Sequence, residues 1–542
     1  MSPSPSARSA LPPCLLVAAV AAAAYLNAFG HEFVYDDLPL VLWNERLRSW
    51  QGLLECFASS YWTDGNTGLY RPLTLLSFAL DRAVSGEATW SYAATNVLLH
   101  ACTSSAAFWW ARELGARKPA ALATALLFAV HPVHTEAVTW VAGRAEVLCG
   151  ACALVALAAH RRAPQGGGWR LLSGLAFSAA LLAKEHAVAL VAVAPALDLF
   201  CGRGSLRKRL SPRRGGYLLF AALTASYLAL RAWVLGDAAW GPRYVVPLDN
   251  PLVPRVTSLL GNTYGTTASE RLLSAVALWG EHLRLLCWPA RLSADYSYAQ
   301  WLPVRSLGDA RLWIGALALG GCAAGALLLR RRAPVAAAGL AFLLGVCAVS
   351  SQVLRPTGTV YAERLLYLPS AGFLLWVGCA FDRAWRRCRW RAAASGALVL
   401  SLSLGAARTW LRNPAWTNRR TLWEETVRTS PQSARAHGNL GLLYLSAAEG
   451  IEARGDLPAS RREQVARALT ERAAQHLARS LEIYPERAGL NVTYAETALK
   501  LGRLAEARQA LERARRLGRG VLSPEGARVA TLLSAATDRE SR

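Results

Sequence analysis

The strongest constraint on the fold of this chain is a series of apolar runs, each close to the length of a transmembrane helix. About 20 mostly apolar residues carry an α-helix across the hydrocarbon core of a bilayer. A net charge of +24 is typical of nucleic-acid-binding proteins, but those proteins do not contain such runs, and 53% of this sequence is hydrophobic. We therefore exclude nucleic acid as a partner and predict an all-α, polytopic helical bundle in a lipid bilayer. About eleven spans are predicted, centred on residues 11–29, 93–111, 119–133, 144–160, 170–183, 186–200, 215–234, 312–329, 334–353, 365–381 and 392–408.

Lysine and arginine gather in alternate loops, and this bias predicts the orientation of the bundle. The basic loops are residues 112–118, 161–170, 202–214, 330–332 and 382–391, which we expect in the cytoplasm. An even number of spans must separate any two of them. Residues 170–200 are therefore expected to cross twice, and the half-polar segment 272–288 to lie on the outer surface or to re-enter. The N-terminus is then inside and the C-terminus outside.

The chain changes character after residue 410, where Ala, Arg, Glu and Leu recur with helical periodicity. We predict a membrane domain over 1–410, with a first outer loop at 30–92, and a tetratricopeptide-repeat α-solenoid over 411–542. The repeat positions are Leu440, Gly441 and Tyr444 in one unit and Ala495, Gly502, Ala507 and Ala514 in the next. An insertion of roughly twenty residues, at about 450–470, is expected between the helices of the first repeat. A generic amphipathic bundle is the alternative; a repeat domain would bind a protein or peptide in its concave surface.

Ionisable residues cluster at the predicted outer ends of the spans. Asp36 and Asp37 follow the first span, and Arg71 lies in the same outer loop. Ionisable residues at membrane depth are rare and commonly functional. We expect them to form one outward-facing site, whose other candidates are His131, His134, Glu136, Arg144, Lys184, Glu185, Glu363 and Arg364.

These residue types are suited to an enzyme that transfers a chemical group from a lipid phosphate to a hydroxyl group. Asp36 or Asp37 is the candidate general base, and arginine and lysine are suited to holding a phosphate. Helix capping is the alternative role for the aspartates, and interfacial snorkelling is the alternative for the arginines. No cofactor is firmly implied. A divalent cation is an open alternative, although His131, His134 and Glu136 do not share one helix face.

The motifs resemble those of the transmembrane and tetratricopeptide-repeat-containing O-mannosyltransferases. They are "FVYDD" (33–37), "YRPLT" (70–74), "HPVHTEAVTWVAGRAE" (131–146), "ADYSY" (294–298) and "ERLLYLPSAGF" (363–373), followed by the repeats. The resemblance implies a type C glycosyltransferase fold and an inverting transfer of mannose or a similar hexose. The donor would be a polyprenyl-phosphate sugar and the acceptors Ser or Thr hydroxyls.

The resemblance also implies roles for particular residues and a location. Asp36 and Asp37 would supply the base, Arg71 would contact the phosphate, and Glu363 and Arg364 would line the donor pocket. The Ala- and Arg-rich composition suggests a bacterial inner-membrane protein with its repeats in the periplasm. Alternatives are a non-catalytic scaffold that gathers envelope proteins, an enzyme acting on a lipid or glycan, and a transporter. A transporter would need midplane polar residues and inverted repeats, which the sequence does not show.

Overall fold

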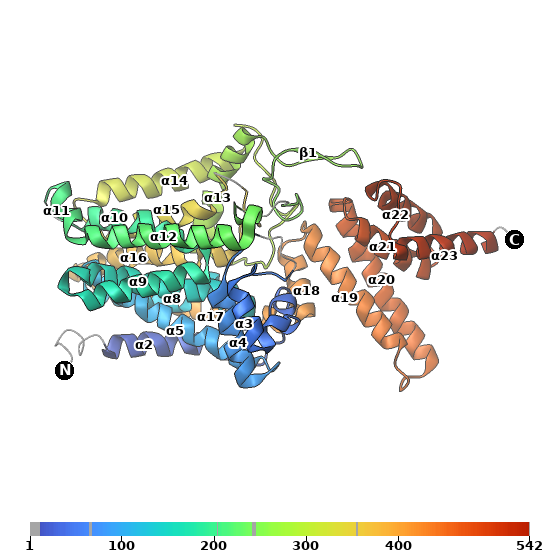
Figure 1. The fold of residues 1–542 in the computed structure, drawn as a ribbon, viewed down its shortest axis with the longest axis horizontal. Helices are drawn as coiled ribbons and strands as arrows, with labels where there is room; N and C mark the ends of the chain where they lie inside the picture. The colour runs from blue at the N-terminus through green and yellow to red at the C-terminus, as the bar shows by residue number, and fades with distance from the viewer. Residues whose placement is uncertain (1–10, 64–67, 203, 241–244, 354–355, 541–542) are drawn as a thin grey trace.

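The chain folds into a long helical bundle with a smaller helical domain at one end (Figure 1). The computed structural model describes residues 11–63, 68–202, 204–240, 245–353 and 356–540. Within these ranges the only strands are β1 (Val256–Thr257) and β2 (Thr263–Tyr264), an antiparallel ribbon in which Val256 faces Tyr264. The predicted all-α class is confirmed.

Each of the eleven predicted span segments contains a helix. They are α2 (Leu11–Ala24), α5 (Trp90–Glu113), α6 (Lys118–Val130), α8 (Arg144–Arg162), α9 (Gly167–Ala183), α10 (Leu190–Cys201), α12 (Arg214–Leu235), α14 (Ala310–Leu329), α15 (Pro334–Cys347), α16 (Tyr367–Trp385) and α17 (Arg391–Arg412).

Fewer than eleven of these helices are long and apolar enough to cross a bilayer alone. In the described part of the chain, five helical stretches meet that standard, and a sixth does if the pair 118–130 and 132–139, bent by 49°, counts as one. Three shorter apolar helices cover 12–28, 167–183 and 334–350. Leu218, Leu317 and Leu328 are exposed by 69%, 78% and 76%, as lipid-facing side chains would be. These features indicate a multi-pass membrane protein. The number of eleven spans stays a prediction.

The segment expected to lie outside or re-enter forms α13 (Ala268–Cys287), which packs along α14. A Cβ on Gly315 of α14 would lie 2.1 Å from the Val276 carbonyl oxygen, so glycine permits this close crossing. The first turn of α13 contacts the outer ribbon through Glu270 and Arg255, 2.8 Å apart. Its last turn accepts a hydrogen bond at the Leu286 carbonyl from the ring of His131, at 3.0 Å. Both ends of α13 therefore contact segments expected on the outer side.

The loops predicted to lie outside contain three further helices, and the C-terminal part of the chain contains six. The loop helices are α3 (Trp50–Phe57), α4 (Pro72–Ser85) and α7 (Thr135–Thr139). A five-residue helix, α11 (Leu206–Leu210), lies in a basic loop at the opposite end. The C-terminal helices are α18 (Arg419–Thr429), α19 (Ala434–Glu452), α20 (Ala459–Ile483), α21 (Ala488–Lys500), α22 (Leu504–Leu517) and α23 (Pro524–Glu540).

A small residue brings the helices of the first repeat hairpin together, as the sequence predicts, whereas Gly502 lies in the turn between α21 and α22, with a φ of 76° and no atom within 4 Å of a Cβ, so its predicted place at a helix crossing is wrong. A Cβ on Gly441 of α19 would lie 2.8 Å from Cγ of Leu477 on α20. We predicted an insertion of roughly twenty residues between these two helices, and this prediction is wrong. Only residues 453–458 connect α19 to α20, because the extra sequence lengthens both helices. The long hairpin is visible in Figure 1.

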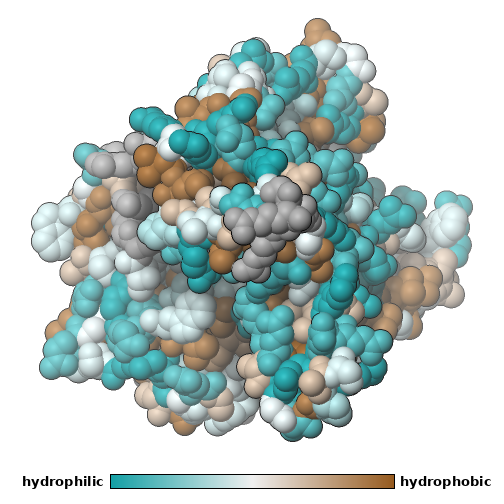
Figure 2. All heavy atoms as spheres, turned by 90° about the vertical axis from the view of Figure 1, so that its right-hand side faces the viewer, coloured by the Kyte–Doolittle hydropathy of each residue, from teal (hydrophilic) through white to brown (hydrophobic). Residues whose placement is uncertain are grey.

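The first repeat shares a hydrophobic core with the first outer loop. Trp416, Trp423 and Leu440 pack in one buried cluster with Val34 and Tyr92. The helices α21 to α23 have a separate core. The predicted boundary at residue 410 falls near the end of α17, but the apolar core continues across it. The end of the molecule that carries the repeats exposes mostly hydrophilic side chains (Figure 2).

Candidate functional site

Segments that are distant in the sequence meet where the bundle joins the C-terminal domain. The turn after α2 carries Asp36 and Asp37, and it contacts residues 140–142 from the segment before α8. The opposite end holds a different cluster, in which the buried Asp198 pairs with Arg213 at 3.4 Å and with Arg161. The charged outer segments therefore meet at one end, away from the basic loops.

Asp37 holds the turn in place. Its side chain is 1% exposed. One carboxylate oxygen accepts a hydrogen bond from the Val34 amide at 3.0 Å, and the other accepts one from the Ala142 amide at 2.7 Å. Because both oxygens are occupied, the Asp37 carboxylate joins two segments of the site and does not cap the following helix.

Asp36 is the half-buried carboxylate of the pair, and no described residue donates a hydrogen bond to its side chain. Burial raises the pKa of Asp36 to about 6, while the positive charges of Arg364 and Arg435 oppose that rise. Tyr35 has a φ of 51°, a left-handed conformation that a bulky side chain rarely adopts. The turn that presents Asp36 is therefore strained as well as charged.

Three ion pairs lie beside the aspartates, and each joins two of the predicted site segments. Arg71 binds Glu185 through two hydrogen bonds of 2.9 and 2.6 Å. Lys184 pairs with Glu146, a residue missed by the sequence analysis. These pairs bring the first outer loop, the start of α8 and the turn before α10 together.

The third ion pair, between Arg364 and Glu136, extends the same cluster toward Asp36. The Glu136 carboxylate accepts the Arg364 backbone amide at 2.8 Å and also binds its guanidinium. The Arg364 guanidinium lies 5.3 Å from the ring centre of Trp140. Arg364 is close enough to Asp36 to affect its ionisation. The cluster therefore holds three cations, each with a carboxylate partner, and Arg364 is the one of the three that acts electrostatically on Asp36.

Tyr61 connects the aspartates to the Arg71 pair, and the sequence analysis missed it. The Arg71 guanidinium lies 5.1 Å from the ring centre of Tyr61. The Tyr61 hydroxyl is buried and has no hydrogen-bond partner among the described residues. Asp36 and Arg71 both act electrostatically on this hydroxyl, so it lies within range of both.

Three predicted ligand residues instead stabilise the protein's own structure. His131 bonds the Leu286 carbonyl, and His134 bonds the Phe128 carbonyl at 2.9 Å and Ser370 at 2.8 Å. Arg144 is fully buried and donates to Asn96, the Ser77 and Tyr92 carbonyls, and Asp81. With their polar atoms engaged in this way, these side chains are not part of the site we propose. No group of three or more His, Cys, Asp or Glu side chains in the described ranges is arranged to hold a metal.

Glu363 is completely buried beside the site. One carboxylate oxygen accepts hydrogen bonds from the Tyr296 hydroxyl at 2.6 Å and the Ser293 amide at 2.5 Å. The other oxygen has no hydrogen-bond partner among the described residues. Glu363 thus anchors the segment around "ADYSY" to the start of α16.

Arg435 enters the site from α19, and the sequence analysis missed it because it lies within a repeat. Its guanidinium contacts Asp295 at 3.0 Å, Asp249, and the Tyr35 hydroxyl at 3.4 Å. The C-terminal helix α19 therefore contributes a cation within electrostatic range of Asp36.

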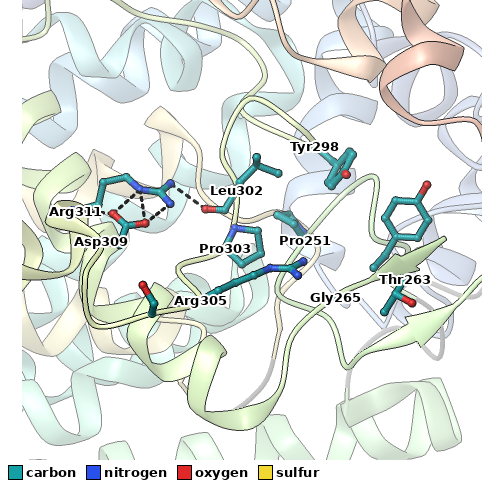
Figure 3. A pocket seen from close by; sticks show the side chains of 11 residues that line it. Pro251, Thr263, Gly265, Tyr298, Leu302, Pro303, Arg305, Asp309 and Arg311 are labelled. Carbon is teal, nitrogen blue, oxygen red and sulfur yellow. Dashed lines mark hydrogen bonds and ion pairs between the residues drawn. The ribbon is translucent and has the colours of Figure 1, made fainter.

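A pocket of about 400 Å³ is lined by residues from the 251–265 and 298–311 segments (Figure 3). Tyr298 forms one wall, the Arg305 side chain extends across it, and Arg311 is paired with Asp309 at its edge. None of the eleven predicted site residues lines this cavity. The candidate site and this pocket therefore share none of these residues.

The fold and the site together define a multi-pass helical membrane protein with a charged cluster at one end, to which the C-terminal helix α19 contributes Arg435. Residues 466–535 match the tetratricopeptide repeat family model. The predicted repeat domain is confirmed over this range.

Curated relatives cover most of the chain. The protein O-mannosyl-transferase Tmtc1 of Drosophila melanogaster is 28% identical over 508 residues, which span 78% of this chain and 58% of that protein. The protein O-mannosyl-transferase TMTC4 of Mus musculus is 28% identical over 493 residues, spanning 80% and 64%. The chain is a homologue of these proteins, and the predicted resemblance is confirmed. The alignments span less than two thirds of each relative's own length.

Solved structures align at lower similarity. ArnT from Cupriavidus metallidurans in the apo state gives a TM-score of 0.42 at 13% identity, covering 98% of this chain and 78% of ArnT. The Archaeoglobus fulgidus oligosaccharyltransferase in the apo form gives 0.39 at 12% identity, covering 84% and 59%.

Proposed function

We propose that this chain is a membrane glycosyltransferase that moves mannose or a similar hexose from a polyprenyl-phosphate donor to Ser or Thr hydroxyls of exported proteins. One observation carries the proposal. Asp36 is a half-buried carboxylate with no hydrogen-bond donor among the described residues, beside a cluster of arginine and lysine at the end of an apolar bundle. The names of the homologues agree with this chemistry.

Asp36 is the general base in this proposal. A base is most effective when its pKa lies near the working pH, and a pKa of about 6 meets that requirement. The acceptor hydroxyl transfers its proton to Asp36 as its oxygen attacks the anomeric carbon of the sugar. The bond from that carbon to the phosphate oxygen breaks, and its electron pair leaves with the lipid phosphate. A single displacement of this kind inverts the configuration at the anomeric carbon.

Arg71, Lys184 and Arg364 hold the donor phosphate in this proposal. A guanidinium can bind phosphate through two parallel hydrogen bonds. Arg71 is held in such a two-bond geometry by Glu185, and Arg364 is held by Glu136. The carboxylate partners orient these cations before the donor arrives, so little reorganisation is needed on binding.

The site faces the non-cytoplasmic side in this proposal. The basic loops lie at the opposite end, as the positive-inside bias requires. Thiol labelling of cells tests this orientation. Cys388 is exposed in a basic loop and should react with a membrane-impermeant reagent only after permeabilisation. A Ser534→Cys variant in the repeats should react in intact spheroplasts, and the reverse pattern would refute the orientation.

Transfer itself is tested with purified full-length protein, a panel of polyprenyl-phosphate sugars, and Ser- and Thr-containing peptides. Mass spectrometry should detect sugar on a hydroxyl with wild type and with Asp309→Asn, a control acid that pairs with Arg311 outside the cluster. Asp36→Asn should abolish transfer while the protein stays folded. Sugar found only on co-purified lipid or glycan would show that the acceptor is a lipid or glycan and not a protein. No transfer from any donor, with proteins still captured by the repeats, would favour the scaffold.

A further inference from the structure

The turn that presents Asp36 is held from two sides. Tyr35 stacks on Trp140 of the membrane domain at 6.0 Å and meets the edge of Trp423 of α18 at 5.2 Å. Its hydroxyl accepts a hydrogen bond from Arg435 of α19 at 3.4 Å. Two of these three contacts come from the C-terminal part of the chain.

Those contacts matter because the turn is strained. A non-glycine residue in the left-handed region is strained and persists only where its surroundings fix it. Tyr35 has a φ of 51°. If Trp423 and Arg435 were absent, only Trp140 would remain of the three contacts that hold the Tyr35 ring. The position of the neighbouring Asp36 therefore depends on the C-terminal helices.

Arg435 is itself held firmly. Its guanidinium pairs with Asp295, which is 5% exposed, and with Asp249. Asp295 also accepts hydrogen bonds from Ser433 and Ser297, so its carboxylate is fully engaged. A charge-assisted network of this kind fixes the direction of the arginine.

The largest charge effects on Asp36 come from four separate segments, and Tyr35, Asp37 and Tyr61 are the other titratable groups that it affects. The cations are Arg364, before α16, and Arg435, in α19. The carboxylates are Glu136, in α7, and Asp249, in the loop before β1. The repeat domain contributes one of the two cations, so it affects both the geometry and the ionisation of the base.

We infer that the repeat domain is a built part of the transfer site, in which Arg435 is a positioning residue that holds the Asp36 turn. This inference rests on the proposed function and adds to it. A repeat domain that only captured acceptor proteins would affect the capture of long acceptors. A domain that positions the base must also affect transfer to a peptide too short to reach the repeat groove.

The test measures transfer to such a short peptide by full-length Arg435→Gln and Arg435→Lys variants. Two controls match them. Glu486→Gln weakens a different contact between the domains, in which Glu486 accepts hydrogen bonds from Ser258 at 2.6 Å and Asn262 at 2.8 Å. Arg503→Gln breaks a pair with Glu471 inside the repeats.

Arg435→Gln should lower kcat on the short peptide by roughly tenfold or more, which corresponds to about 1.4 kcal/mol in the activation free energy. It should also shift the acid limb of the pH profile, where the rate falls as the base is protonated, to higher pH. Arg435→Lys keeps the charge, so its acid limb should stay near that of wild type. Asp249→Asn removes a negative charge that raises the Asp36 pKa, so it should move the limb downward. Both controls should leave kcat and the limb unchanged.

The inference would be overturned if Arg435→Gln and Glu486→Gln changed short-peptide transfer equally, or if Arg435→Gln changed only KM for long acceptors. If Arg435→Gln failed to fold, Asp249→Asn would serve as the test on its own. A pH profile of Asp249→Asn that did not move downward would then overturn the inference.

Hydrogen exchange gives a readout that does not depend on activity. The peptide covering residues 31–43 should exchange faster in Arg435→Gln than in Glu486→Gln. If the wild-type protein transferred no sugar but the two variants still differed in exchange, the proposed function would be refuted and the structural link would stand. Transfer without the difference would refute the link alone.

Discussion

The ionisation of Asp36 gives the most direct test of the site. With a pKa of about 6, roughly nine-tenths of this carboxyl is ionised at pH 7 and roughly one-tenth at pH 5, so kcat/KM should fall about tenfold between these values. An aspartate of ordinary pKa, about 3.9, would lose almost nothing over the same range. The position of the acid limb thus separates a buried base from an exposed carboxylate.

The assay is single-turnover sugar transfer to a short Ser-containing peptide, followed by mass spectrometry from pH 4.5 to pH 8. Asp36→Asn should lower the rate by about 10²–10⁴-fold, the usual contribution of a general base. It should leave the melting temperature unchanged or raised, because a group whose folded-state pKa is raised destabilises the fold while it is ionised.

Asp37→Asn is the matched comparison. The NH₂ group of an asparagine side chain cannot accept a hydrogen bond, so Asp37→Asn would lose one of the two bonds from the Val34 and Ala142 backbone amides. This variant should lose about 1–3 kcal/mol of stability. Its acid limb should stay near pH 6. A profile that stays flat to pH 4.5, or an Asp37→Asn variant that loses transfer while Asp36→Asn keeps it, would refute the assignment of the base.

Four further outcomes are expected. Arg71→Gln should raise KM for the donor and leave KM for the peptide unchanged in steady-state kinetics, since Arg71 is placed to hold phosphate. Glu185→Gln should have a smaller effect in the same direction, because it only loosens the Arg71 geometry. Gly441→Ala should destabilise the repeat domain by about 1–3 kcal/mol in thermal unfolding, because its Cβ would meet Leu477. Gly450→Ala, in the same helix with no atom within 4 Å, should instead stabilise it by about 0.5–1 kcal/mol.

The sequence predicts the helices well because length and apolarity determine them. Each apolar run is helical in the structure, and Gly441 lies where a close helix crossing requires a small residue. The sequence also predicts that the charged residues meet, because the basic loops define the opposite end. The form of the repeat insertion was wrong because helical periodicity can continue through extra residues without changing the pattern.

The pairing of the charges could not be predicted in the same way. Arg71 and Glu185 are 114 positions apart, and only tertiary packing determines that they meet. Similarly, Asp36 and Asp37 are adjacent in the sequence, yet one lies beside the cations and the other bonds two backbone amides. Arg435 looks like any other arginine of a repeat helix, and the left-handed Tyr35 has no signature in composition or spacing.

The pairing of every cation with a carboxylate bears on how the proposed transfer would be accelerated. A catalyst gains rate only from interactions that strengthen between the bound substrate and the transition state. The donor phosphate carries one negative charge while the sugar is attached, and it gains a second as the bond to the anomeric carbon breaks. Arg71, Lys184 and Arg364 are each shared with a carboxylate, so each is partly neutralised toward the singly charged donor. As charge develops on the leaving phosphate, cations already oriented by their carboxylate partners attract it more strongly, and the stabilisation is greatest where the barrier lies.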